Sequence, residues 1–179
     1  MGKTKAPSRK EGPGVNPSIA DAARRLFDVV RIVDVRLVEC RAYLRGDTPR
    51  PLLLSTRRDA RGSRSPDGRQ ACAQVRFTLE GRPDENGKKD ADLFIEATFS
   101  AMYDIPKDLE ASDDALDFFA HTNGTFNLWP YWREFVQTMA NRMGVPGLTV
   151  PTYRIEEAFS GPGSADRTQQ GRTPRTRRK

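Results

Sequence analysis

Hydrophobic residues first recur at the three-to-four spacing of a helix and then alternate as in strands. The helical spacing covers residues 19–30, directly after Pro17 and Ser18, and Ser18 is a suitable N-cap. Over residues 32–44 the period changes to two, with a shift of face that indicates a β-bulge. We therefore predict an N-terminal helix followed by a long first strand.

Three further strands are expected. Residues 52–57 suit a short second strand, and residues 58–70 have the composition of a basic loop. Residues 73–79 and 93–103 alternate apolar and polar side chains over their whole length. Consecutive strands without intervening helices favour an antiparallel sheet. One face of this sheet is expected to be continuously apolar.

The end of the domain is expected to be helical. Ser112 is a good N-cap, and Asn123-Gly124 has the form of a helix stop. Residues 126–130 then suit a linker, because their proline fits the first turn of the next helix. A broad apolar stripe follows over residues 131–143, and Gly144 is expected to end that helix. The predicted fold class is α+β: a four-stranded antiparallel sheet with C-terminal helices packed on it, plus an N-terminal helix.

The formal charge of +6 is concentrated at the two ends of the chain. Residues 1–17 hold four basic residues and one acidic residue, and residues 160–179 hold six and one. Both are poor in apolar residues, so we expect disordered basic tails around a domain over residues 18–159. That domain carries 20 basic and 22 acidic residues, a net −2. A nucleic-acid- or ribosome-binding module acting through the tails is the alternative function.

The chain reads as a cytoplasmic protein. It has no run of about 18 apolar residues for membrane insertion, and its first residues lack the apolar run of a signal peptide. Two cysteines, Cys40 and Cys72, make neither a disulfide framework nor a metal site. Both lie in or near strands, where we expect buried small hydrophobes.

Residues suited to catalysis are sparse. The single histidine, His121, stands beside a predicted helix end, where a hydrogen-bonding or capping role is the usual one. The acidic residues Asp113, Asp114 and Asp117 suit a solvated helix start that complements the helix dipole. No glycine cluster matches a phosphate-binding loop. We therefore expect no enzyme, no cofactor and no metal.

Aromatic residues are dense near the last helices, with six between residues 118 and 132. One four-stranded sheet is too small to bury all of them. Some should line a surface groove or a subunit interface. For any single one of these aromatic residues, a place in the core and a place in a groove both remain open. Met139 and Met143 add adaptable apolar surface.

The stretch from Thr125 to Tyr153 resembles the end of the SecB family of export chaperones. The likeness consists of an aromatic-Pro-Tyr-x-Arg-Glu helix start and a Val-Pro-x-Leu exit, and the order of elements upstream extends it to roughly residues 30–155. The matching residues are Asn127, Leu128, Trp129, Pro130, Tyr131, Arg133, Glu134, Arg142, Gly144, Val145, Pro146 and Leu148.

The resemblance implies a homotetramer, a dimer of dimers, that acts as an ATP-independent holdase for unfolded polypeptides. Clients would lie in grooves between the sheet and the helical linker, bound by apolar side chains and by backbone hydrogen bonds. Phe135 and Val136 would serve the core and interfaces. The candidate groove residues are Leu52, Leu54, Phe126, Leu128, Trp129 and Trp132.

The sequence departs from the export members at the surface that docks on the SecA motor. Phe94 and Glu96 match docking positions, but Arg41 and Arg45 stand where acidic residues are usual. Such a charge reversal would replace electrostatic attraction between this surface and the SecA motor by repulsion. A branch of SecB-like proteins holds the antitoxin of toxin–antitoxin pairs. Export and a dedicated client such as an antitoxin both remain open, with the arginines favouring the second.

Overall fold

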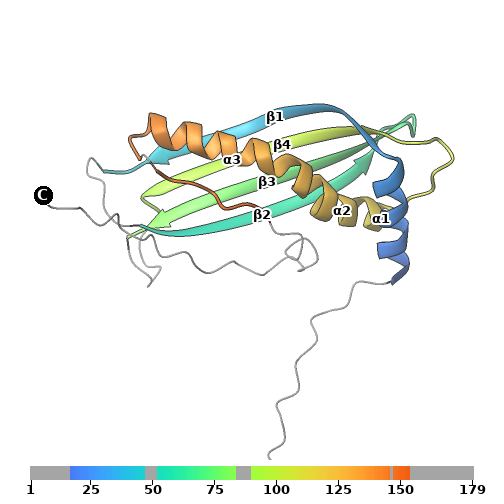
Figure 1. Ribbon diagram of the computed structural model, residues 1–179, viewed down its shortest axis with the longest axis horizontal. Coiled ribbons are helices and arrows are strands. Elements are labelled where there is room, and N and C mark those ends of the chain that lie inside the picture. Colours follow the sequence, from blue (N-terminus) through green and yellow to red (C-terminus); the bar gives the residue numbers. More distant parts are fainter. Residues whose placement is uncertain (1–16, 47–51, 84–89, 146, 154–179) are drawn as a thin grey trace, which may run out of the picture.

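The computed structural model describes residues 17–46, 52–83, 90–145 and 147–153. Its elements, in chain order, are α1 (Pro17–Val29), β1 (Arg31–Leu44), β2 (Leu53–Arg64), β3 (Gln70–Arg82), β4 (Leu93–Asp104), α2 (Asp113–Phe119), the π-helix η1 (Ala120–Gly124) and α3 (Thr125–Arg142). Figure 1 shows α2 and α3 crossing one face of the sheet, with α1 at one end. The predicted α+β fold is confirmed. Among the described helices, none has the length and apolarity that a membrane crossing requires.

The four strands pair antiparallel in the order β1-β4-β3-β2, so β1 and β2 are the edge strands. The bulge predicted in the first strand is confirmed. Its pairing with β4 shifts between Ile32 and Asp34 and again between Leu37 and Glu39. The ladder between β2 and β3, by contrast, runs without a shift from Leu53 to Arg64.

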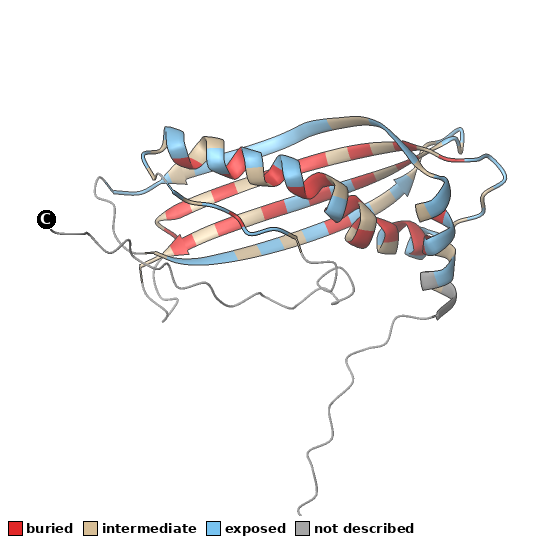
Figure 2. Cartoon of the chain, in the orientation of Figure 1, coloured by how far each residue is buried: buried red, intermediate tan, exposed pale blue. Residues whose placement is uncertain are grey.

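The core lies between the central strands and the helices. Buried and less buried residues alternate along β3 and β4, as Figure 2 shows. Because successive side chains of a strand point to opposite faces, this alternation defines a buried inner face toward the helices and a less buried outer face. The predicted inward-facing set is confirmed as buried: Ala73, Val75, Phe77, Leu79, Leu93, Ile95, Ala97, Phe99, Ala101 and Tyr103.

The second strand is longer than predicted, because the expected loop over residues 58–70 is mostly strand. β2 continues to Arg64, and only residues 65–69 form the turn to β3. The polar outer face and two small inward positions, Ala60 and Gly62, hide the alternation. Gly62 is small because α2 touches the sheet there: a Cβ atom would lie 2.1 Å from the carbonyl oxygen of Leu116.

The predicted helix stop at Asn123-Gly124 and the linker after it are wrong, because α2, η1 and α3 form one continuous helical path. Gly124 keeps a helical φ of −58°. Its role is close approach, since a Cβ atom there would lie 2.6 Å from Cβ of Ala73. Within the wide turn, the hydroxyl of Thr125 donates to the carbonyl of Ala120 at 3.1 Å. Pro130 is exposed inside α3, where water can reach the carbonyl that loses its helical donor.

The two outer helix ends differ in how well they were predicted. Helix α3 ends as expected, because Gly144 adopts a φ of +74° and the N–H of Val145 donates to the carbonyl of Ala140 at 2.9 Å. Helix α1 begins at Pro17, so Ser18 lies inside it and does not precede it. The ring of Phe27 packs 5.7 Å from Phe119, which joins α1 to α2.

Strand β1 is the least covered part of the sheet. Most of its residues are exposed, on both faces of the strand, and the most exposed large apolar side chain is that of Val38 at 53%. Cys40 also lies exposed on this strand, and Cys72 is half-buried, so the expectation of two buried cysteines is wrong. The exposed large apolar residues of β1 are Ile32, Val33, Leu37, Val38 and Leu44.

Candidate functional site

Aromatic rings form a continuous stack from the core to the surface at the start of α3. Trp129 packs edge-on against Phe77 with the centroids 5.7 Å apart, and it contacts Tyr153 at 5.0 Å. Phe126 lies 6.4 Å from Tyr153 and is 48% exposed, whereas Trp129 is 8% exposed. The outer end of the stack therefore offers an aromatic side chain to the surrounding surface.

Residues 147–153, which follow α3, pack back along that helix and form one wall of the site. The indole N–H of Trp129 donates to the carbonyl of Pro151, and the Nε–H of Arg133 donates to the carbonyl of Val150, both at 2.9 Å. Val150 is buried, and the guanidinium of Arg58 on β2 lies 5.3 Å from the ring of Tyr153. These contacts hold an extended backbone beside β2 through side-chain donors.

The other wall belongs to the beginning of β2. Leu52 is partly buried and Leu54 is exposed. Both reach the space above Gly81: a Cβ atom there would lie 3.0 Å from Cδ1 of Leu52 and 3.3 Å from Cδ2 of Leu54. The missing side chain of Gly81 thus leaves room for the two leucines. We call the five residues Leu52, Leu54, Phe126, Trp129 and Tyr153 together the apolar ledge. Its rings lie near Arg58 on β2, and its leucines lie at Gly81, next to the start of the same strand.

Two predicted groove residues belong to the core and are removed from the site. Leu128 is 0% exposed and Trp132 is 1% exposed. Trp132 stacks on Phe77 with the centroids 5.4 Å apart. They lie four positions apart on the face of α3 that meets the sheet, because the helix continues where a linker was expected. Tyr153 and Arg58, which were not predicted for the site, take part in it.

The predicted docking residues meet on the outer face of the sheet. Tyr43 and Phe94 stack with their centroids 5.2 Å apart. The guanidinium of Arg41 lies 5.5 Å from the ring of Tyr43 and 5.8 Å from that of Phe94, and Arg45 lies 5.2 Å from Tyr43. Glu96 stands opposite Arg41 in the ladder. Tyr43 was missed, although its alternation with the two arginines was visible in the sequence.

The charges at this corner are partly compensated. Arg45 donates to Asp90 at 2.7 Å, and this hydrogen bond lowers the pKa of Asp90 and raises that of Arg45. The hydroxyl of Thr78 donates to Glu96 at 3.1 Å. Arg41 contacts only the two rings among the interactions found in the described residues. The corner is therefore a surface of half-buried aromatic rings and exposed guanidinium groups.

Groups with catalytic or ligating potential are scattered. His121 is half-buried in η1, and burial lowers its pKa against the opposing influence of Asp59 and Asp117. The thiol of Cys72 lies 3.2 Å from the hydroxyl of Ser100. Across the described ranges, no three His, Cys, Asp or Glu side chains gather as a metal site would require. What the described surface offers is binding by apolar contact and by backbone hydrogen bonds.

Comparison with known proteins finds a similar solved structure. No protein-family model matches the sequence, and neither does any curated protein. A solved structure matches with a TM-score of 0.65 and 22% identity, over 75% of this chain and 97% of that chain. It is the Mycobacterium tuberculosis Rv1957 SecB-like chaperone in complex with a ChAD peptide from the Rv1956 HigA1 antitoxin.

This chain has the SecB-like fold. The likeness implied by residues 125–153 is thereby confirmed at the level of the fold. In this chain the helices lie on one face of the sheet (Figure 1), and the corner of Tyr43 and Phe94 lies on the opposite face.

Proposed function

We propose that this chain is an ATP-independent holdase that binds unfolded or non-native polypeptides. The apolar ledge is the observation that carries the proposal. It combines an exposed phenylalanine, an exposed leucine and the edge of β2 on one side of the SecB-like fold. A groove that binds many sequences needs apolar surface and backbone contacts, because neither depends on one particular side chain.

The proposed assembly is a homotetramer, a dimer of dimers. Exposed apolar side chains on both faces of β1 form a patch of the kind that soluble proteins cover by association. A second copy beside β1 would also cover the free edge of that strand. Strand β2, whose exposed end carries Leu54 of the apolar ledge, would then be left for clients.

The outer face of the sheet favours a dedicated client, such as an antitoxin, over export. Attraction to a SecA motor through an acidic surface is not available where Arg41 and Arg45 flank Tyr43. Support also comes from the match to a SecB-like chaperone complexed with an antitoxin peptide. The alternative role in nucleic-acid binding concerns residues 1–17 and 160–179, whose placement is outside the described residues except for Pro17.

Aggregation of a chemically unfolded model protein tests the proposal. The wild-type chain should suppress light scattering at about one assembly per client, equally with and without ATP. The double variant Leu54→Ala/Phe126→Ala should suppress it several-fold less. Tyr131→Ala is the matched control, because Tyr131 is 47% exposed on the same helix and lies outside the apolar ledge. Wild-type protein that leaves aggregation unchanged would contradict the proposal.

A further inference from the structure

Residues 147–153 occupy the candidate site much as a bound peptide would, and we call them the strap. The strap belongs to no helix and no strand, and Figure 1 shows it running between α3 and β2. Two of its carbonyls accept hydrogen bonds from side chains of α3. The carbonyl of Val150 accepts from Arg133 and that of Pro151 accepts from Trp129, both at 2.9 Å.

The strap also supplies apolar contacts to the site. Val150 is 2% exposed, and Leu148 packs against the core. The ring of Tyr153 lies 5.0 Å from that of Trp129 and 6.4 Å from that of Phe126. Tyr153 therefore completes the apolar ledge with a side chain that comes from the strap itself. Carbonyls held by donors and apolar side chains on aromatic rings are the contacts expected of a client.

Few bonds hold the strap in place. Within the described residues, no backbone–backbone hydrogen bond involves residues 147–152. The far half of β2 is joined to the helices more directly, because the N–H of Gly62 donates to Oδ1 of Asp117 at 2.7 Å. Segments without internal hydrogen bonds open at a lower cost in free energy than helices and paired strands. The strap can therefore leave while the sheet and α3 stay folded.

Two glycines form a hinge between α3 and the strap. Gly144 has a φ of +74° and Gly147 a φ of +84°, both in the left-handed region. A Cβ atom at either position would meet no atom of the described residues within 4 Å, so packing does not require glycine there. Backbone conformation does, because residues with a side chain rarely adopt a positive φ. Glycine also lets the chain take other φ values once the strap has left.

We propose that the strap is an intramolecular competitor of the client. It occupies the site in the resting chain, and an unfolded segment displaces it by rotation about Gly144 and Gly147. Release uncovers the indole ring of Trp129 for the incoming polypeptide. The strap thereby sets the apparent affinity, because only the fraction of chains with a released strap accepts a client. This inference rests on the proposed holdase function and adds a regulation of the same site.

Gly147→Ala tests the proposal by straining the docked state. Alanine loses no contact at this open position, but it opposes the positive φ of the docked strap, so the released fraction rises. Anisotropy of fluorescein-labelled, reduced and carboxymethylated α-lactalbumin measures the affinity for an unfolded protein. The variant should bind it about threefold more tightly or better. Unchanged or weaker binding would overturn the competition, since a fixed wall of the site gains nothing from strain.

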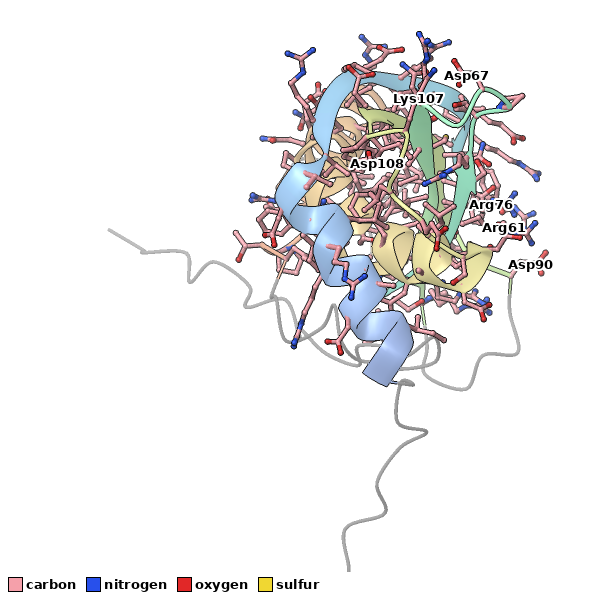
Figure 3. The ribbon with its side chains drawn as sticks, turned by 90° about the vertical axis from the view of Figure 1, so that its right-hand side faces the viewer. Arg61, Asp67, Arg76, Asp90, Lys107 and Asp108 are labelled. Carbon is pink, nitrogen blue, oxygen red and sulfur yellow. The ribbon has the colours of Figure 1, made fainter. Side chains whose placement is uncertain are left out.

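Gly68→Ala is the matched control. Gly68 has a φ of +71° and equally open surroundings, but it lies in the turn between β2 and β3. Figure 1 shows α3 ending at the other end of the sheet from this turn, and Figure 3 shows Asp67 of the same turn from the right-hand side. The control adds similar strain without touching the strap, so its affinity should stay within about twofold of wild type. An equal gain in both variants would overturn the role of the strap.

A spin label on the strap tests its release without straining the backbone. The background Cys40→Ser/Cys72→Ser removes both cysteines of the chain, and the label is attached at Thr152→Cys, an exposed position of the strap. Gln137→Cys, exposed on α3, carries the control label. Saturating unfolded α-lactalbumin should convert most of the restricted spectrum at Thr152 into a mobile one and leave the spectrum at Gln137 unchanged. An unchanged or more restricted spectrum at Thr152 would overturn the release.

The outcomes separate this inference from the function on which it rests. Wild-type protein that binds the unfolded protein, with no gain in Gly147→Ala and no mobile spectrum at Thr152, overturns the strap and leaves the holdase standing. Failure of both wild type and Gly147→Ala to bind overturns the holdase and the strap together. Binding by Gly147→Ala alone would support both, because a tightly docked strap then blocks the wild-type site.

Discussion

At the scale of single residues, two glycines determine how closely the helical layer approaches the sheet. Gly62 lies against the backbone of α2, and Gly124 lies against Ala73. Gly62→Ala should therefore lower the free energy of unfolding by about 1–3 kcal/mol, because the new methyl group must displace backbone. Urea denaturation measures the change, with Ser63→Ala on the same strand as the control. An unchanged midpoint for Gly62→Ala would show that α2 does not sit where we describe it.

Trp129 and Phe126 are expected to have different roles, Trp129 mainly in the stability of the fold and Phe126 mainly in client binding. Trp129 is almost fully buried and donates to Pro151, so Trp129→Ala should cost roughly 3–5 kcal/mol of unfolding free energy. Phe126 is half-exposed, and Phe126→Ala should cost less than about 1 kcal/mol while weakening client capture several-fold. Thermal unfolding and peptide anisotropy measure the two effects. The reverse ranking of the two stability losses would contradict the placement of both side chains.

His121 should make stability depend on pH. Burial lowers its folded-state pKa, Asp59 and Asp117 raise it less, and Arg58 lowers it further. The unfolded chain therefore takes up this proton more readily, so the contribution is present above pH about 6.5 and is lost as pH falls below it. Urea denaturation between pH 8 and pH 5 should show that the free energy of unfolding falls less with decreasing pH in His121→Gln than in wild type. Identical pH profiles would rule out this contribution.

At this scale the sequence predicted side-chain direction well on β3 and β4 and poorly on α3. Alternation identified the inward face, because both central strands are covered on one side only. Leu128 and Trp132 were assigned to a groove because the resemblance to the SecB family implied one beside a helical linker, and both side chains are buried. The real reason for Gly124 is contact with Ala73, which no local pattern contains.

At the scale of elements, Arg41 on β1 and Arg45 just after it stand where the resemblance to the SecB family predicts acidic residues. Replacing both arginines, Arg41→Asp with Arg45→Glu, should raise affinity for a SecA motor at least about fivefold at low salt, since repulsion becomes attraction. Surface plasmon resonance at two salt concentrations measures the change. Arg36→Asp, on the same strand and face as Arg41, is the control for a charge reversal outside the corner and is compared with Arg41→Asp alone. No gain in the double variant would mean that this face is not the docking surface.

The elements themselves were predicted unevenly, for physical reasons. The existence of four strands and the end of α3 followed from alternation and from Gly144. The second half of β2 was missed because only two of its inward positions, Ala60 and Gly62, are small while the other two are arginines, so no apolar alternation shows and the composition is that of a loop. The continuity of α2 with α3 depends on a π-turn in which hydroxyls of Thr122 and Thr125 bind carbonyls.

At the scale of the whole molecule, the exposed apolar residues of β1 predict association. Light scattering should give a native mass near four times the 20.1 kDa of one chain. Leu37→Asp should reduce that mass, because a carboxylate would be buried in the apolar interface. Ser55→Asp on the other edge strand should leave it unchanged. A wild-type monomer, or an equal effect of the two variants, would contradict an assembly through β1.

The candidate site could be predicted from sequence only in outline. Aromatic density and the likeness of residues 125–153 to the SecB family pointed to the start of α3. The sequence did not reveal that Tyr153 returns to cover Trp129, or that Asp117 reaches Gly62. Both contacts join segments that are far apart in the chain, and they depend on the packing of the whole fold.

The central claim is that this chain recognises the non-native state of a polypeptide. Fluorescence anisotropy with one labelled protein in two states tests it most directly: native α-lactalbumin, and the same protein reduced and carboxymethylated so that it stays unfolded. The account predicts saturable binding of the unfolded form alone, unchanged by ATP and weakened several-fold by Leu54→Ala/Phe126→Ala. Equal binding of both forms, or binding of neither, would contradict it.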